Sequence, residues 1–208
     1  IQGEWTIRAI GLPNAVLRKI YFDNAHKLLA RSLPPAVCKV ARASAPLDLK
    51  DLTSEAWSKA PVHRLEYGSA NATASPQSST LIPALYTDDS LYLRYDAPYS
   101  ELATFEPARF DSERVGLWDR DVVEAFIGTD LENPKVYHEF EVAPTNENLD
   151  LIIAPEIPDV VKRLEWNSGW ESFVKLDHDA KVWTTVMRIP LKSLSQEPVT
   201  PGTRWRLN

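Results

Sequence analysis

Alternation of apolar and polar residues dominates the chain from residue 80 onward. Leu91, Leu93 and Tyr95 alternate with polar neighbours, which is the two-residue period of a strand with one buried face. Prolines scattered through this part exclude long helices. Many short strands at regular spacing predict an antiparallel β-sandwich of the immunoglobulin or jelly-roll kind. The predicted strands are 80–86, 90–96, 121–127, 136–142, 148–153, 171–176 and 181–189, with another beginning near 203.

The N-terminal part of the chain has a helical period instead. From Val16 to Leu29 apolar residues recur at spacings of three and four, and Pro13 suits the first turn of a helix. The pattern predicts one amphipathic α-helix, which needs a partner surface because a single apolar stripe cannot bury itself. The partner could be the sandwich, or the helix could end a domain whose remainder is not in this chain.

Charge and proline content divide the chain near residue 45. Residues 1–45 carry seven basic and two acidic side chains, whereas residues 46–208 carry 16 basic and 27 acidic ones and 13 of the 16 prolines. This shift predicts two segments of different origin. We assign residues 1–32 to the helix, residues 33–45 to a linker rich in Pro, Ala, Arg and Ser, and residues 46–208 to the sandwich.

Composition argues against several classes of function. The net charge of −6 makes a nucleic-acid or anionic-membrane partner unexpected, since both need a basic face. A single cysteine rules out an intramolecular disulfide framework and a zinc site built on several cysteines. The sequence contains no run of 18 or more apolar residues, so no segment is expected to span a membrane. It also contains no glycine-rich phosphate loop and no HExxH or GxSxG motif. The cellular compartment is not indicated.

The region that follows Trp118 holds the densest set of candidate functional side chains. Glu124 is a carboxylate inside an otherwise apolar strand, which is costly unless a partner or ligand meets it. In the next strand Tyr137, Glu139 and Glu141 share one face. If the two strands pair, Glu124 and one of the other glutamates lie on one concave surface beside Trp118. We take these five as candidate ligand-binding residues.

Carboxylates beside an aromatic ring fit three kinds of surface. They could form a glycosidase dyad, a sugar-binding face where the ring stacks and the carboxylates accept hydroxyl hydrogen bonds, or a solvated sheet face without a ligand. Asp119, Asp121 and the acidic loop at 111–113 could instead bind Ca²⁺ through oxygen atoms, or be ordinary surface charge. The four histidines are widely scattered, which argues against a His-rich metal site.

Several short motifs follow one another in a characteristic order. They are Asp51-Leu52, Trp57, Leu91–Tyr95, Leu117–Ile127, Tyr137–Pro144, Asn148–Leu151, Arg188–Pro190 and Gly202–Asn208. Over roughly residues 46–208 this ordered set resembles the family 9 carbohydrate-binding modules and their family 9-like relatives. The resemblance implies a sandwich that binds sugars, often chain ends, through an aromatic clamp on the concave sheet. It also implies structural Ca²⁺, which family members frequently hold.

The resemblance implies roles for individual residues. Trp118 matches one tryptophan of the sugar clamp, and Glu124 matches a carboxylate that contacts sugar hydroxyls. Glu141 stands where the xylan- and cellulose-binding members carry a sugar-binding arginine. The second clamp tryptophan would lie beyond Asn208, so the sandwich is expected to be incomplete at its C-terminal end. We predict a non-catalytic module in which Trp118 stacks on a pyranose ring, both glutamates accept hydrogen bonds and Arg94 donates one.

A second resemblance concerns the predicted helix. The run Leu12–Leu29 resembles the final helix of the amidohydrolase-related (β/α)₈ barrel hydrolases, and none of that family's metal ligands lies in this segment. It implies an upstream catalytic domain in the same polypeptide, with the sandwich as an accessory of a metal-dependent hydrolase. A third hypothesis is a structural or interaction sandwich that binds no small ligand.

Overall fold

The computed structural model describes residues 13–24, 37–65 and 79–208. The chain divides into two compact units, residues 1–38 and 39–208, and each is described by itself. In the first unit, α1 (Asn14–Arg18) continues into the π-helical turn η1 (Lys19–Asp23). The predicted helix is therefore present as far as it is described, and its second half lies outside the described residues. Val16 and Ile20 of its apolar stripe are exposed.

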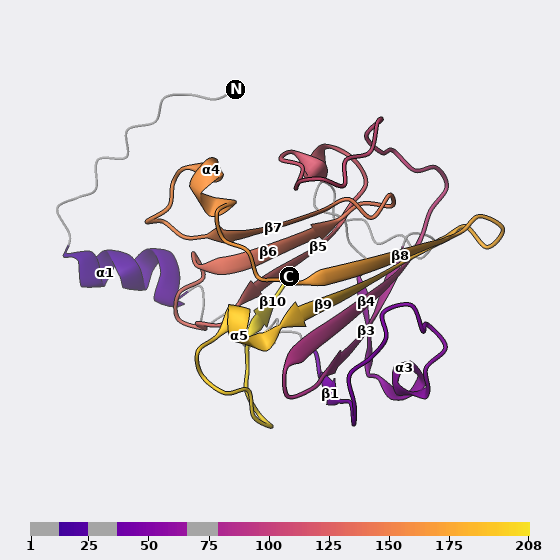
Figure 1. Cartoon of the computed structure of the whole chain (residues 1–208). Coiled ribbons are helices and arrows are strands. Elements are labelled where there is room, and N and C mark those ends of the chain that lie inside the picture. Colours follow the sequence, from indigo (N-terminus) through magenta and orange to yellow (C-terminus); the bar gives the residue numbers. More distant parts are fainter. Residues whose placement is uncertain (1–12, 25–36, 66–78) are drawn as a thin grey trace. The chain divides into compact units, whose positions relative to one another are not determined.

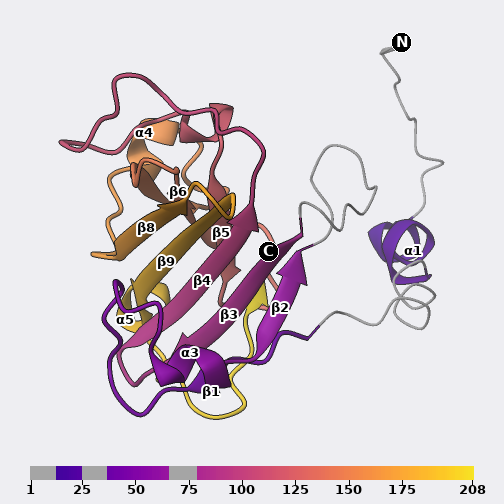
Figure 2. The same cartoon turned by 90° about the vertical axis from the view of Figure 1, so that its right-hand side faces the viewer.

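Two sheets face each other in the second unit (Figures 1 and 2). Sheet A contains, in spatial order, β1 (Ala41–Arg42), β3 (Thr80–Tyr86), β4 (Ser90–Pro98), β9 (Val182–Pro190) and β8 (Glu171–Asp177), with β2 (Val62–Leu65) also paired to β3. Sheet B contains β10 (Arg206–Leu207), β5 (Val123–Gly128), β6 (Tyr137–Val142) and β7 (Asn148–Ile153). All pairs are antiparallel except β1 with β3. The predicted antiparallel sandwich is confirmed.

Four short helices lie in the described segments that connect the strands of the second unit. They are α3 (Glu55–Lys59), the 3₁₀ turn η3 (Leu117–Asp119), α4 (Val160–Arg163) and α5 (Leu191–Leu194). Among the described residues, no helix has the length and apolar character needed to cross a bilayer.

The core lies between the sheets, where alternate residues of the central strands meet. Leu93 and Tyr95 of β4 face Ala125 of β5 and Phe140 of β6, and all four are almost completely buried. The Tyr95 hydroxyl crosses to sheet B and donates a hydrogen bond of 3.1 Å to the backbone carbonyl of Glu124. Burial, with a smaller effect of the Glu124 charge, raises the pKa of Tyr95 well above its usual range, so this donor stays protonated.

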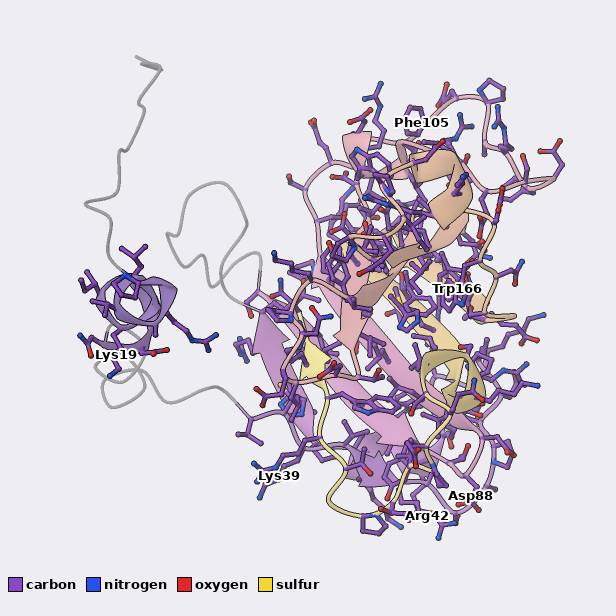
Figure 3. The ribbon with its side chains drawn as sticks, turned by 90° about the vertical axis from the view of Figure 1, so that its left-hand side faces the viewer. Lys19, Lys39, Arg42, Asp88, Phe105 and Trp166 are labelled. Carbon is purple, nitrogen blue, oxygen red and sulfur yellow. The ribbon has the colours of Figure 1, made fainter. Side chains whose placement is uncertain are left out.

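The sandwich begins earlier than predicted. Residues 41 and 42 form β1, which pairs with the end of β3, and Arg42 forms an ion pair with Asp88 in the β3–β4 turn (Figure 3). The segment that follows carries Trp57 on α3, which packs with Leu47 against Tyr92 on the outer face of sheet A. The expected linker over 33–45 therefore ends near residue 38, because backbone pairing and this packing draw the next residues onto the sheet.

Gly128, the last residue of β5, lies beneath the guanidinium of Arg206. A Cβ atom at Gly128 would lie 2.3 Å from Arg206 Nη2. The same guanidinium donates hydrogen bonds of 2.7 to 3.1 Å to the backbone carbonyls of Asp130, Asn133 and Val136. Arg206 thereby ties the β5–β6 loop to β10, and glycine is needed for its close approach.

Replacing Gly128 by alanine is expected to lower the free energy of unfolding by about 2 kcal/mol, because the displaced guanidinium loses charged hydrogen bonds. Chemical denaturation of Gly128→Ala, Arg206→Ala and the double variant measures this. We expect the glycine substitution to cost almost nothing once Arg206 is absent. An equal cost in both backgrounds would show that the clash is not the cause.

Candidate functional site

The outer face of sheet B brings the predicted glutamates together. In the β5–β6 register, Glu124 lies opposite Glu141 and Phe126 lies opposite Glu139. Their neighbours along both strands point into the core, so these side chains and that of Tyr137 point away from it. We call this set of five the carboxylate face. The strand pairing on which the predicted site depended is present.

Glu141 is buried completely, with 0% of its surface exposed. Among the described residues, neither of its carboxyl oxygens has a hydrogen-bond partner of ordinary geometry. Burial, together with the neighbouring Glu139 and Glu124, raises the pKa of Glu141 to about 9, so the group is protonated at neutral pH. Glu139 lies close enough to share that proton, although the two carboxyl groups are not aligned as a regular hydrogen bond.

The other two glutamates are only partly buried. Burial raises the pKa of Glu124, and the charge of Glu139 adds to the effect. Burial also raises the pKa of Glu139, against the opposing influence of Glu141 and of the Arg163 guanidinium. The carboxylate face therefore carries fewer than three negative charges at neutral pH, because adjacent carboxylates repel one another.

One side of the outer face is filled by apolar packing. Leu149 and Leu151 of β7 are buried beneath Leu117 of η3, with Phe105 and Leu164 packed against the same cluster. The open part of the face therefore lies over Glu124, Phe126, Tyr137 and Glu139, which are only partly buried. Phe126 and Tyr137 meet there edge to face, with ring centroids 5.7 Å apart.

Trp118 stands beside this cover. It follows the buried Leu117 on η3, which contacts β6, and 45% of its surface is exposed. An exposed indole on a packed turn offers a flat apolar surface on which a ligand could stack. The predicted platform residue is thus exposed on the element that borders the carboxylate face.

A buried carboxylate holds the loop that carries η3. Glu147, which is 2% exposed, accepts hydrogen bonds from the Arg109 backbone N–H at 2.8 Å, the Arg114 guanidinium at 2.7 Å and the Thr145 hydroxyl at 2.8 Å. Burial opposes ionisation, but these bonds and the Arg114 charge outweigh it and lower the pKa of Glu147. Phe105, labelled in Figure 3, lies against the Arg114 guanidinium at 4.6 Å. Glu147 is therefore ionised, and in this form it anchors the loop.

Sequence reasoning missed Glu147 and Phe126 as parts of the site. Glu147 lies between polar residues in a turn, where a carboxylate is usually exposed. Phe126 could have been found, because it shares the two-residue period of Glu124.

The structure does not bring Arg94 to the carboxylate face. Arg94 lies on the outer face of sheet A, where it donates hydrogen bonds to Asp96 at 3.0 Å and to the Leu52 carbonyl at 2.9 Å. Its alternation with core residues along β4 was predicted, but which sheet β4 joins was not. A hydrogen bond from Arg94 to a ligand on sheet B is therefore excluded by placement.

Asp119 and Asp121 were the predicted metal ligands. Asp121 accepts a hydrogen bond of 2.7 Å from the backbone N–H of Ala103, which ties the start of β5 to the loop before it. Within the part of the chain that the structure describes, no group of three or more His, Cys, Asp or Glu residues could hold a metal ion. The geometry thus offers no ready site for the expected Ca²⁺, which stays a prediction.

Comparisons with known proteins agree with this architecture. No protein-family model matches the chain. A protein of Arthroderma benhamiae described as an extracellular protein is 26% identical over 142 residues, which are 64% of this chain, and the chain spans 63% of that protein's length.

Two solved structures of a family 9 carbohydrate-binding module from Caldicellulosiruptor kristjanssonii resemble this chain. The complex with cellotriose has a TM-score of 0.51 at 15% identity and covers 77% of this chain and 68% of its own. The complex with glucose has a TM-score of 0.50 at 16% identity, with coverage of 77% and 70%. The chain therefore has a family 9-like fold, as its motif order predicted. The resemblance of residues 12–29 to amidohydrolase-related barrels finds no support in these comparisons.

Proposed function

We propose that this chain is a non-catalytic carbohydrate-binding module whose ligand lies on the open part of the carboxylate face. The observation that carries the proposal is an exposed Trp118 bordering a sheet face with three clustered glutamates, on a family 9-like sandwich. Trp118 stacks on the apolar face of a pyranose ring, while Glu124 and Glu139 accept hydrogen bonds from hydroxyls. Tyr137 borders the ligand. Glu141 acts from beneath, through its proton shared with Glu139.

Both similar structures hold glucose-type sugars, cellotriose in one and glucose in the other. This supports a sugar with equatorial hydroxyls as the first class of ligand to test. An apolar ring face on such a sugar suits an indole.

A glycosidase is the less suitable alternative. Its two carboxyl groups must flank the scissile bond from opposite sides. Glu124 and Glu141 instead lie side by side on neighbouring strands, and Glu141 has no exposed surface. We therefore assign no catalytic residue to this chain. An upstream catalytic domain stays a hypothesis.

An interaction sandwich without a small ligand is the second candidate. It is favoured by the apolar cluster around Leu117, Leu149 and Leu151, which fills the β7 side of the outer face. This reading expects no heat of binding with any sugar.

Replacing Trp118 by alanine is expected to abolish measurable sugar binding, because the stacking surface is lost while the fold is retained. Isothermal titration calorimetry with glucose, cellobiose, cellotriose and xylobiose measures it. Phe110→Ala, which removes an aromatic ring that is 72% exposed on the same long loop, is the matched control and should bind like wild type. Absence of heat with every sugar in the wild-type chain would overturn the proposed function.

A further inference from the structure

Three acidic side chains, Glu124, Glu139 and Glu141, occupy one small area of the carboxylate face. Glu124 and Glu141 are directly opposed across β5 and β6, an arrangement that is destabilising for like charges. None of the three glutamates forms an ion pair with a described residue. The Arg163 guanidinium influences Glu139 and Tyr137 from the side, but it donates its hydrogen bond to the Ile157 carbonyl.

Glu141 is the strongest sign that this cluster is built for a ligand. It is completely buried, both of its oxygens lack a regular partner in the described structure, and it lies directly across the strands from Glu124. A solvated acidic patch would turn its carboxylates to water, whereas Glu141 has no exposed surface. A buried carboxyl group that shares its proton with Glu139 in irregular geometry is costly, and a cationic ligand beside the cluster would reduce that cost.

A neutral sugar does not satisfy this arrangement well. Its hydroxyls can donate to carboxylates, but they leave the mutual repulsion in place. An ammonium group supplies a positive charge and three N–H donors at once. A divalent metal is a poorer fit, since the described residues form no group able to hold one. Oxygen atoms lie about 2.7–2.9 Å from an ammonium nitrogen but about 2.3–2.6 Å from Ca²⁺, so an ammonium needs a looser cluster.

We infer that the preferred ligand of the carboxylate face is an amino sugar with a free, protonated amine, such as a glucosamine unit. This inference rests on the proposed function. The pyranose ring stacks on Trp118, and the ammonium lies over Glu124 and Glu139, with Glu141 as the third carboxyl group beneath. Binding draws negative charge onto the cluster, and the proton held by Glu141 is released to solvent.

Calorimetric titrations with three matched disaccharides test the inference. They are the fully deacetylated glucosamine disaccharide, its N-acetylated form and cellobiose, which share the β-1,4 linkage and differ at C2. We expect the deacetylated sugar to bind at least tenfold more tightly than the other two at pH 6.5 and low salt. We also expect proton release, seen as a heat that depends on the ionisation enthalpy of the buffer. The preference should shrink in high salt.

Two substitutions separate this inference from general attraction between a cation and an acidic protein. Glu141→Gln keeps the shape of the side chain and should weaken binding of the deacetylated sugar about tenfold more than it weakens binding of cellobiose. Glu197→Gln removes one exposed acid of the loop after α5 and should leave the preference unchanged. Spermidine serves as a probe without a sugar ring and should bind weakly.

The outcomes are distinguishable. Equal affinity for cellobiose and the deacetylated disaccharide would overturn the inference and leave the proposed function standing. Spermidine binding as tight as that of the amino sugar, or an equal loss in the Glu197 variant, would also overturn it. Absence of binding by all three sugars would overturn both.

Discussion

Replacing Glu147 by alanine is expected to lower the free energy of unfolding by about 3 kcal/mol, the largest single effect that we predict for this chain. Removing one partner of a buried ion pair leaves the other charge without compensation. Here Arg114, whose side chain is only 17% exposed, loses its carboxylate, and the backbone N–H of Arg109 and the Thr145 hydroxyl lose their acceptor. Urea denaturation at pH 7 measures the change.

The same substitution should weaken sugar binding, because Glu147 fixes the loop that carries η3 and Trp118. Thr145→Val removes one of the three hydrogen bonds and should cost about 1 kcal/mol. A Glu147→Ala variant as stable as wild type would contradict the assignment of this loop as an anchored element. Since the pKa of Glu147 is lowered in the folded state, its contribution is present at neutral pH and is lost as the pH falls below the usual carboxyl range.

The stability of the sandwich should fall as the pH rises from 5 to 9. The pKa of Glu141 is near 4.5 in the unfolded chain and about 9 in the folded one. Burial and the neighbouring Asp150 raise the pKa of Glu113 to about 8 in the folded chain. Between these values the folded state holds protons that the unfolded state has lost. The free energy of unfolding therefore falls as the pH rises through this window, by at most about 1.4 kcal/mol per pH unit for the buried Glu141 and by less for the partly exposed Glu113, whose charge water screens.

Thermal or chemical unfolding at several pH values between 5 and 9 checks this slope. Glu141→Gln should flatten it by about one proton, since glutamine mimics the protonated carboxyl group at every pH. Glu113→Gln should remove the contribution of Glu113 to the pH dependence of the free energy of unfolding, which extends up to about pH 8. A slope unchanged in the Glu141 variant would show that this group is ionised in the folded protein.

The sandwich itself could be predicted because strand periodicity is local. The pattern around Leu91 and the β6 alternation reflect which face of a strand is buried, and β7 was predicted with its observed bounds. β1 and β2 were missed because they are short, and their pairing depends on a neighbouring strand rather than on their own composition. The helix before the sandwich followed from its period, but the identity of any partner did not.

Some features of the candidate site could likewise be predicted from the sequence, whereas others depend on the tertiary structure. By itself, the sequence determined that Glu124 lies in an otherwise apolar strand, that Glu139 and Glu141 share a face, and that a family 9-like fold was to be expected, because these follow from the strand's composition, the two-residue period and the motif order. Only the tertiary structure decided that β5 pairs with β6 in the register that opposes Glu124 and Glu141. It also decided that Arg94 belongs to the other sheet, that Glu141 is completely buried, and that Glu147 anchors the loop that carries η3. Such facts depend on contacts between distant residues, which no local pattern encodes.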